Sequence, residues 1–142
     1  MRLLPGSVIG LAAAALVAST GAPAAEPSAG QREFQTRCVM CHGATGKGDG
    51  WMAQYLINRP PALTLLKKNN GGVFPATDVF EIILGRKSIS LHGPREMPVW
   101  GNIYRMEQKM AGNAKSKARA ADERAIRAKI RALTDYIAQL QE

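Results

Sequence analysis

The stretch Cys38-Val39-Met40-Cys41-His42 places two thiols and an imidazole within five residues. Two residues between the cysteines put both sulfurs on one side of a short helical turn, and His42 follows directly. This order, C-x-x-C-H, is the attachment signature of a c-type haem. Each thiol can form a thioether with a haem vinyl group, and a ring nitrogen of His42 can bind the iron as fifth ligand. The stretch therefore predicts one haem c, held covalently through Cys38 and Cys41.

Three other interpretations of these residues compete with haem attachment. Cys38 and Cys41 also fit a structural disulfide or a thioredoxin-like C-x-x-C, although no βαβ pattern lies nearby. A zinc site needs a fourth ligand, and His92 is the only other histidine. The third alternative is a chance match, because the motif is short.

The first 24 residues are predicted to be a secretory signal peptide. Arg2 precedes a mostly apolar stretch, and Ala22-Pro23-Ala24 has the small–x–small form of a cleavage site near Ala24. The alternative is an uncleaved membrane anchor, for which the stretch is rather short and rich in alanine. Residues 25–142 then form a single domain with no further membrane span. Bacteria attach haem to apocytochrome c outside the cytoplasm, so leader and motif both predict a periplasmic protein.

Basic residues outnumber acidic ones in this chain of 142 residues, 19 to 11, giving a formal net charge of +8. Such a charge favours redox protein partners with acidic docking surfaces. Nucleic acid is the alternative partner, but no nucleic-acid-binding motif accompanies the charge, so none is expected. Residues 102–121 are basic, and we expect a solvated surface loop or the extended start of the last helix there. A docking patch is the second interpretation of this segment.

The first helix is expected over residues 29–37. Ser28 and Gln31 fit an S-x-x-Q capping box at its start. Gly30 and Phe34 lie one turn apart on one face, where a glycine permits the close approach of another helix. The segment therefore predicts a helix that packs tightly through its Gly30–Phe34 face.

The last helix shows an apolar stripe with alternating spacings of four and three residues. The stripe predicts either a coiled-coil dimer or, more simply, packing on the first helix of the same chain. Tyr136 lies at its flank. The stripe consists of Ile126, Ile130, Leu133, Ile137 and Leu140.

Between these helices, turn signals separate two further features. Four glycines in residues 43–50 predict a loop whose backbone passes close to a bulky planar group. A short helix is expected to start with Thr77 or Asp78 as its cap and to stop at Gly85. It is apolar almost all round, which predicts burial on most sides.

Met97 is the predicted sixth ligand of the iron. It lies in Arg95-Glu96-Met97-Pro98, where glycine and proline residues on both sides indicate a stiff loop that presents one side chain. A thioether sulfur is a known haem ligand. The alternatives are that Met97 only fills the core, or that His92 is the ligand instead. Trp100 is expected to pack near the haem edge.

These residues resemble the class I cytochrome c family over essentially all of the predicted mature chain. Cys38, Cys41 and His42 match its attachment motif, and Met97 in Glu-Met-Pro matches its distal methionine. Two further matches complete the resemblance. Gly30 and Phe34 resemble the residues of the family's N-terminal helix that pack on its C-terminal helix, where Leu133 and Tyr136 are the matching partners. Pro61-Ala62-Leu63 resembles the family's P-x-L segment. The resemblance implies a small all-α fold with three or more helices around one covalent haem. It also implies that the carbonyl of Pro61 accepts a hydrogen bond from His42.

The predicted function is one-electron transfer by a haem whose iron is ligated by His42 and Met97. Two protein ligands leave no open coordination position, so the chain is expected to be an electron carrier and not an enzyme. The alternative is the electron-transfer haem subunit of a periplasmic dehydrogenase or sulfur-oxidising complex. A separate class is a ligand sensor or peroxidase-like enzyme in which Met97 is labile. The protein is thus predicted to be a monomer or a subunit of a heteromer.

Overall fold

The computed structural model describes residues 26–88, 97–112 and 116–142. The predicted leader and the rival ligand His92 lie outside these residues. The described part contains helices and no strand, which confirms the all-α prediction. The helices are α1 (Ala29–Arg37), α2 (Val39–His42), α3 (Leu66–Asn69), α4 (Ala76–Leu84), α5 (Trp100–Met110) and α6 (Ser116–Gln139), with 3-10 turns at Ala53–Tyr55 and Leu63–Leu65.

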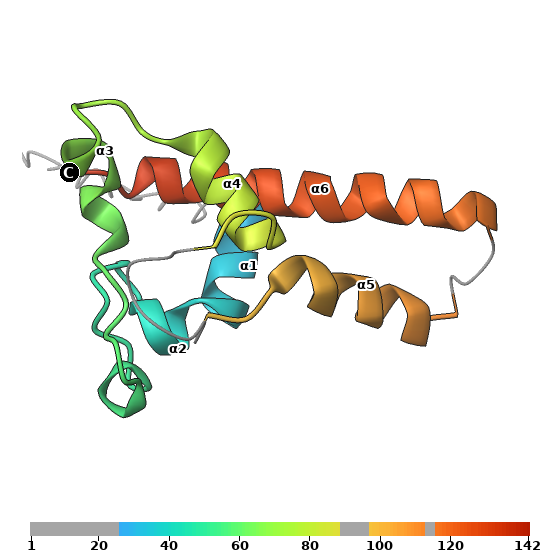
Figure 1. Ribbon diagram of the computed structural model, residues 1–142, viewed down its shortest axis with the longest axis horizontal. Coiled ribbons are helices and arrows are strands. Elements are labelled where there is room, and N and C mark those ends of the chain that lie inside the picture. Colours follow the sequence, from blue (N-terminus) through green and yellow to red (C-terminus); the bar gives the residue numbers. More distant parts are fainter. Residues whose placement is uncertain (1–25, 89–96, 113–115) are drawn as a thin grey trace, which may run out of the picture.

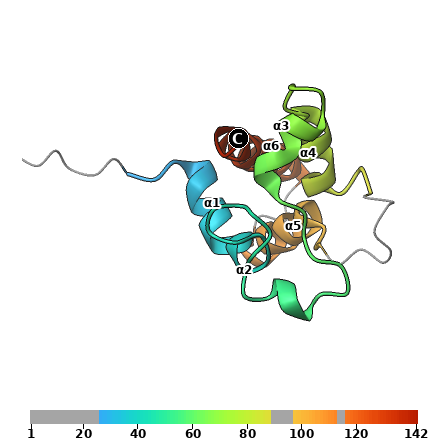
Figure 2. The ribbon, with the colours of Figure 1, turned by 90° about the vertical axis from the view of Figure 1, so that its left-hand side faces the viewer.

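Helix α6 runs along the length of the molecule, and three helices pack against it (Figure 1). Viewed end-on, α1, α4 and α5 lie around α6 (Figure 2). Its predicted apolar stripe faces this core, where Ile126, Ile130, Leu133 and Ile137 are buried. The stripe is therefore covered within the chain, as the simpler of the two predictions for it required.

Helices α1 and α6 cross at Gly30. A Cβ added there would lie 2.6 Å from the carbonyl carbon of Ala132 and 2.9 Å from Cβ of Tyr136, so only glycine fits. One turn later Phe34 is fully buried, and its ring centroid is 5.4 Å from that of Tyr136. At the start of α1, the Gln31 N–H donates to Ser28 Oγ (3.1 Å), as expected of a capping serine. The predicted pairing of the two terminal helices is confirmed.

Helix α4 is less buried than predicted and begins earlier than expected. It buries Val79, Phe80, Ile83 and Leu84, whereas its first three residues are exposed. It starts at Ala76, directly after Pro75, and neither Thr77 nor Asp78 caps it. Pro75 is the N-cap, with a non-helical φ of −81° and ψ of 63°, and its carbonyl accepts the first helical hydrogen bond, from the Val79 N–H (3.0 Å). The helix stops at Gly85, whose φ of 92° is the left-handed conformation that favours glycine.

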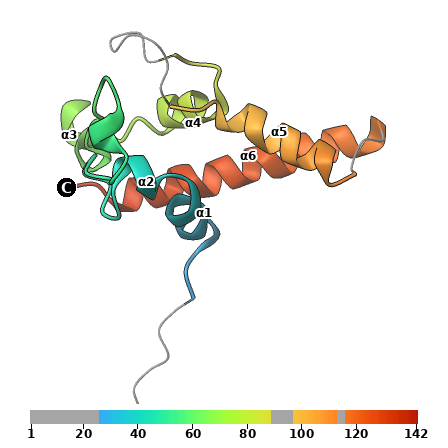
Figure 3. The same cartoon turned by 90° about the horizontal axis from the view of Figure 1, so that it is seen from below.

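Helix α5 corrects the prediction for residues 102–121. Residues 100–110 form a separate helix and not a surface loop, whereas residues 116–121 are the start of α6, so the second of the two expectations holds for that part alone. Figure 3 shows α5 beside the part of α6 that lies away from the C-terminus. Gly101 packs against Leu84 of α4, and Tyr104 is 2% exposed. The apolar residues of α5 recur with a clear helical period, but its charged residues continue into the basic stretch before α6, so the helix was not recognised in the sequence.

Among the described residues, the longest helices are too polar to cross a lipid bilayer.

Candidate haem-binding site

One helical turn carries the two thiols and the imidazole. Cys38 ends α1, where its N–H donates to the carbonyl of Phe34 (2.9 Å), and it also precedes α2. The Cys38 carbonyl then accepts hydrogen bonds from the N–H groups of Cys41 (3.2 Å) and His42 (2.8 Å). The sequence prediction of a short turn is therefore correct, and α1 fixes its position against the core.

Both thiols are free, but their environments differ. Cys38 is 8% exposed and belongs to the hydrophobic core, and burial raises its pKa to about 12. Glu33 and Cys41 raise this pKa further, whereas Arg37 lowers it. Cys41 is only half-buried, and burial raises its pKa as well. Both sulfurs are therefore protonated thiols at neutral pH.

His42 is held as a neutral imidazole with unused binding capacity. Burial lowers its pKa to about 4, so the ring is uncharged at pH 7, which is the form that binds metals. Within the described part of the chain, its Nδ1 atom is buried and has no hydrogen-bond partner. An unsatisfied buried nitrogen costs roughly 1–3 kcal/mol. Such a nitrogen marks the imidazole as a group that a bound ligand would stabilise.

The hydrogen bond expected between His42 and the carbonyl of Pro61 is not formed through Nδ1. The proline segment contacts the glycine loop instead. A Cβ at Gly48 would lie 3.3 Å from the carbonyl carbon of Pro60 and 3.4 Å from that of Pro61. The Leu63 N–H donates to the carbonyl of Gly46 (2.7 Å). The proline segment is thus anchored to the glycine loop.

The glycine loop wraps tightly around the attachment turn. The Gly48 N–H donates to the carbonyl of His42 (2.8 Å), and the Gly50 N–H donates to that of Cys41 (3.2 Å). A Cβ at Gly50 would lie 2.6 Å from the carbonyl carbon of Cys41. The close approaches seen here join backbone to backbone, so the glycines fix the conformation of the turn. The predicted approach to a planar group stays a prediction.

Met97 is distant from Cys38 in the sequence, but it packs against the core that contains Cys38. It is half-buried and packs against the hydrophobic cluster, as do Val39 and Trp100. Trp100 opens α5, and its ring lies 5.8 Å from the guanidinium carbon of Arg37. The structure thus brings the predicted sixth ligand and the attachment segment to one core. Ligation by Met97 itself stays a prediction.

A hollow of about 260 Å³ lies elsewhere, between α4 and α6. Phe80, Arg127 and Arg131 line part of it, and none of the predicted site residues does. We assign it no role in haem binding.

A set of polar residues beside the attachment turn was not predicted from the sequence. Glu33 and Arg37 of α1 interact with Tyr104 and Glu107 of α5 and with Lys129 of α6. The spacing of Glu33 and Arg37, four residues apart on one helix, was a visible signal of an ion pair. Their partners on α5 and α6 were not visible, since α5 itself was not predicted.

The fold and the attachment turn together define a small helical protein of the c-type cytochrome class. Residues 27–141, most of the chain, match the family described as cytochrome c. The chain therefore belongs to the cytochrome c family, as a class I c-type cytochrome. Family membership implies a covalent haem c with its iron, redox protein partners and haem-based electron transfer. No curated protein and no solved structure matches the chain.

The residues present fit such a haem. The donor set combines two free thiols on one turn, a neutral imidazole and a thioether sulfur packed against the same core. His42 directly follows the second cysteine on this turn, where the motif requires a metal-binding ring. These groups are the ones that c-type haem attachment and axial ligation need.

Proposed function

We propose that the chain transfers single electrons between redox proteins through haem c attached at Cys38 and Cys41, with His42 and Met97 as axial ligands. The observation that carries this proposal is the single helical turn on which two free thiols and a neutral imidazole lie together. When bound, the haem iron supplies one-electron chemistry by alternating between its ferric and ferrous states.

Each residue of the site then has a defined task. Cys38 and Cys41 hold the porphyrin edge through thioethers, in which the sulfur adds to one vinyl carbon and hydrogen to the other. His42 presents its neutral ring from a turn that the glycine loop keeps rigid. Met97 would supply the iron with a soft thioether donor, which raises the reduction potential relative to stronger donors.

This arrangement favours electron transfer over catalysis at the metal. With both axial positions taken by side chains, oxygen, peroxide or another substrate has no position to occupy. The protein needs only to keep one structure in both oxidation states. A core in which Phe34 and Ile130 are fully buried is suited to that task.

Periplasmic export and acidic partners are further parts of the proposal. The leader in residues 1–24 supports export, and the compartment agrees with haem attachment. The formal charge of +8 supports electrostatic steering toward acidic docking surfaces. Electron exchange with such a partner should slow as salt is added, and a rate independent of ionic strength would count against acidic partners.

Visible spectroscopy of the exported protein tests the ligand set. The ferric form should show the weak far-red absorption band of a methionine–iron bond, and the ferrous form should bind carbon monoxide slowly and incompletely at neutral pH. Rapid, complete binding would contradict ligation by Met97.

Native mass measurement at low concentration tests whether the protein acts as a free carrier or within a complex. A stable heteromer would identify a subunit of a complex, and a monomer would identify a free carrier.

A further inference from the structure

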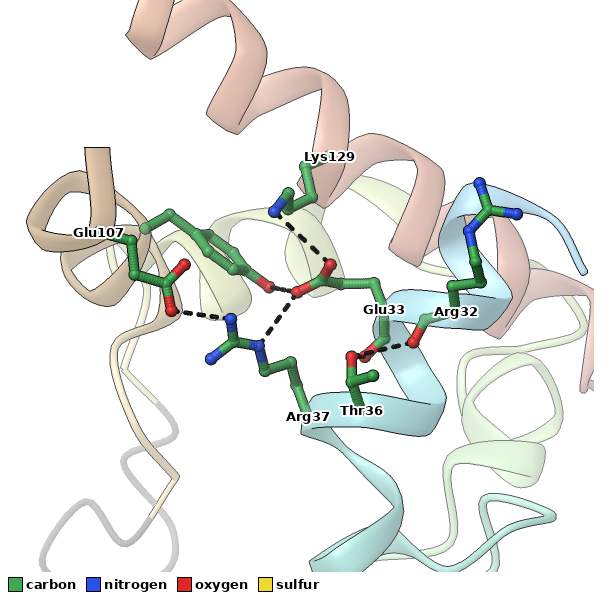
Figure 4. A network of polar contacts seen from close by, with 7 residues as sticks. Arg32, Glu33, Thr36, Arg37, Glu107 and Lys129 are labelled. Carbon is green, nitrogen blue, oxygen red and sulfur yellow. Dashed lines mark hydrogen bonds and ion pairs between the residues drawn. The ribbon is translucent and has the colours of Figure 1, made fainter. Parts of the chain in front are cut away.

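A charged cluster joins three helices beside the attachment turn (Figure 4). The hydroxyl of Tyr104 donates to Oε1 of Glu33 (2.7 Å), and the same carboxylate pairs with Nε of Arg37 (3.5 Å) and Nζ of Lys129 (3.7 Å). Nη2 of Arg37 donates to Oε1 of Glu107 (2.7 Å). We call these five residues the polar junction. Two carboxylates and two cations balance its charge around one neutral phenol.

The centre of the polar junction is buried. The Glu33 side chain is 13% exposed, and Tyr104 is 2% exposed. Burial and the hydrogen bond to Glu33 raise the pKa of Tyr104, so the phenol stays neutral and remains a donor. The side chains of Arg37, Glu107 and Lys129 are 32%, 37% and 44% exposed, so solvent weakens their ion pairs. The hydrogen bond from Tyr104 to Glu33 is the most buried contact of the junction, and we expect it to fix the junction's geometry.

The junction connects the attachment segment to the start of α5. Arg37 directly precedes Cys38, and its guanidinium carbon lies 5.8 Å from the Trp100 ring and 5.9 Å from the Tyr104 ring. Trp100 in turn follows Met97 by three residues and opens α5. In the described chain, the backbones of α1 and α5 do not pack closely as those of α1 and α6 do. Side chains of the polar junction bridge the two helices instead.

We propose that the polar junction positions Met97 for axial ligation by holding the first turns of α5 against the segment that carries Cys38. This inference rests on the proposed function, because it takes Met97 as the ligand. Glu33, Arg37 and Tyr104 are positioning residues in this account and do not touch the iron. Without the junction, the start of α5 moves away from α1 and the sulfur leaves the iron for part of the time.

Glu33 can act on the reduction potential through its negative charge or by positioning Met97. Neutralising Glu33 shifts the potential in opposite directions in these two cases, so the measured shift separates them. Glu33 lies within electrostatic reach of the Cys38 sulfur. A nearby negative charge stabilises the more positive ferric state, so simple removal of that charge raises the potential. Loss of methionine ligation lowers the potential, because methionine raises it relative to stronger donors. Only a positioning role predicts a fall when Glu33 is neutralised.

The test compares exported holoprotein of three variants with wild type. Glu33→Gln keeps the shape and an acceptor for Tyr104 but removes the charge that pairs with Arg37 and Lys129. Tyr104→Phe removes one hydroxyl and leaves every charge in place. Glu123→Gln is the matched control, because it makes the same chemical change in an ion pair with Arg105 that joins α5 to α6 (2.8 and 3.0 Å) outside the junction. The readouts are the far-red ferric band, the reduction potential and the fraction of ferrous protein that binds carbon monoxide.

We expect Glu33→Gln to weaken the band, lower the potential and raise the carbon monoxide-binding fraction about tenfold, the size of effect that loss of one charge-assisted hydrogen bond gives. Tyr104→Phe should show the same changes to a smaller degree. If the Glu33→Gln protein does not accumulate, Tyr104→Phe tests the positioning of Met97 by the same readouts. Glu123→Gln should keep the wild-type band and binding fraction.

The inference is overturned if Glu33→Gln keeps the wild-type band while its potential stays constant or rises, or if Glu123→Gln loses the band equally. These results leave ligation by Met97 intact. A wild-type protein that has no far-red band and binds carbon monoxide completely would instead refute the proposed ligand set, and the positioning role with it. The two failures are therefore distinguishable on wild type alone.

Discussion

Replacing Gly30 by alanine has two opposing effects on the free energy of unfolding, because it raises helix propensity but disturbs the packing of α1 on α6. Alanine is the better helix former, by roughly 0.5–1 kcal/mol. The added Cβ, however, would lie 2.6 Å from the carbonyl carbon of Ala132 on α6. That neighbour is backbone, which cannot rotate away, so α1 and α6 must move apart by roughly 1 Å to relieve the contact.

This separation weakens the packing between α1 and α6. A radial gap of about 0.5–1 Å forfeits a quarter to a half of the dispersion energy of the atoms involved. Phe34 and Tyr136 lie in the affected interface, with ring centroids 5.4 Å apart. Overpacking of this kind typically costs about 1–3 kcal/mol, and the rigid neighbour places Gly30→Ala near the upper end, with the gain in propensity subtracted. We expect a net loss of about 2 kcal/mol.

Urea unfolding of the holoprotein, followed by far-ultraviolet circular dichroism, measures this loss. The midpoint should fall while the slope m stays constant, because a change of packing leaves the surface exposed on unfolding nearly the same. Gln35→Ala is the matched control, since Gln35 is exposed on the same helix and its replacement should stay within about 0.5 kcal/mol of wild type. A Gly30→Ala protein as stable as wild type, or more stable, would refute the close crossing of α1 and α6.

Four further predictions rest on the sequence and the structure together. Phe34→Ala removes a fully buried ring and should cost about 3–5 kcal/mol in urea unfolding; a midpoint equal to wild type would place Phe34 outside the core. The folded-state pKa of Tyr104 is raised, so its contribution to the free energy of unfolding is complete below the unfolded-state pKa of about 10 and declines as pH rises above that value. Tyr104→Phe should therefore reduce the loss of unfolding free energy at alkaline pH. Identical pH profiles for the variant and wild type would contradict this. Met97→Ala should abolish the far-red ferric band and lower the reduction potential, whereas an unchanged ferric spectrum would exclude Met97 as the ligand. Amino-terminal sequencing of exported protein should begin within a residue or two of Ala25, and an intact leader would argue for a membrane anchor.

The sequence was most informative where one physical constraint dominated. Gly30 and Phe34 share a helical face, and their pairing with the last helix was predicted and is confirmed. Gly85 ends α4 because the turn needs a positive φ, and this too was expected. The start of α4 was misplaced because Thr77 and Asp78 are good caps in general, while Pro75 already stands at the N-cap and the helix begins at Ala76.

Residues whose role depends on distant partners were not predictable from the sequence. Helix α5 was missed although its apolar residues recur with a clear helical period, because its charged residues continue into the basic stretch before α6 and hide where the helix ends. The polar junction was missed with it, because Tyr104 and Lys129 reach Glu33 only after three helices have packed. Likewise, the P-x-L resemblance placed the carbonyl of Pro61 near His42, but the geometry of the loop decides whether the bond forms.

Mass spectrometry of the exported protein after acid–acetone extraction tests the central claim most directly. The account predicts that the haem stays on the polypeptide and that its mass maps to the one peptide containing Cys38, Cys41 and His42. A protein that loses its haem to the solvent, or that carries zinc between unmodified cysteines, would contradict it.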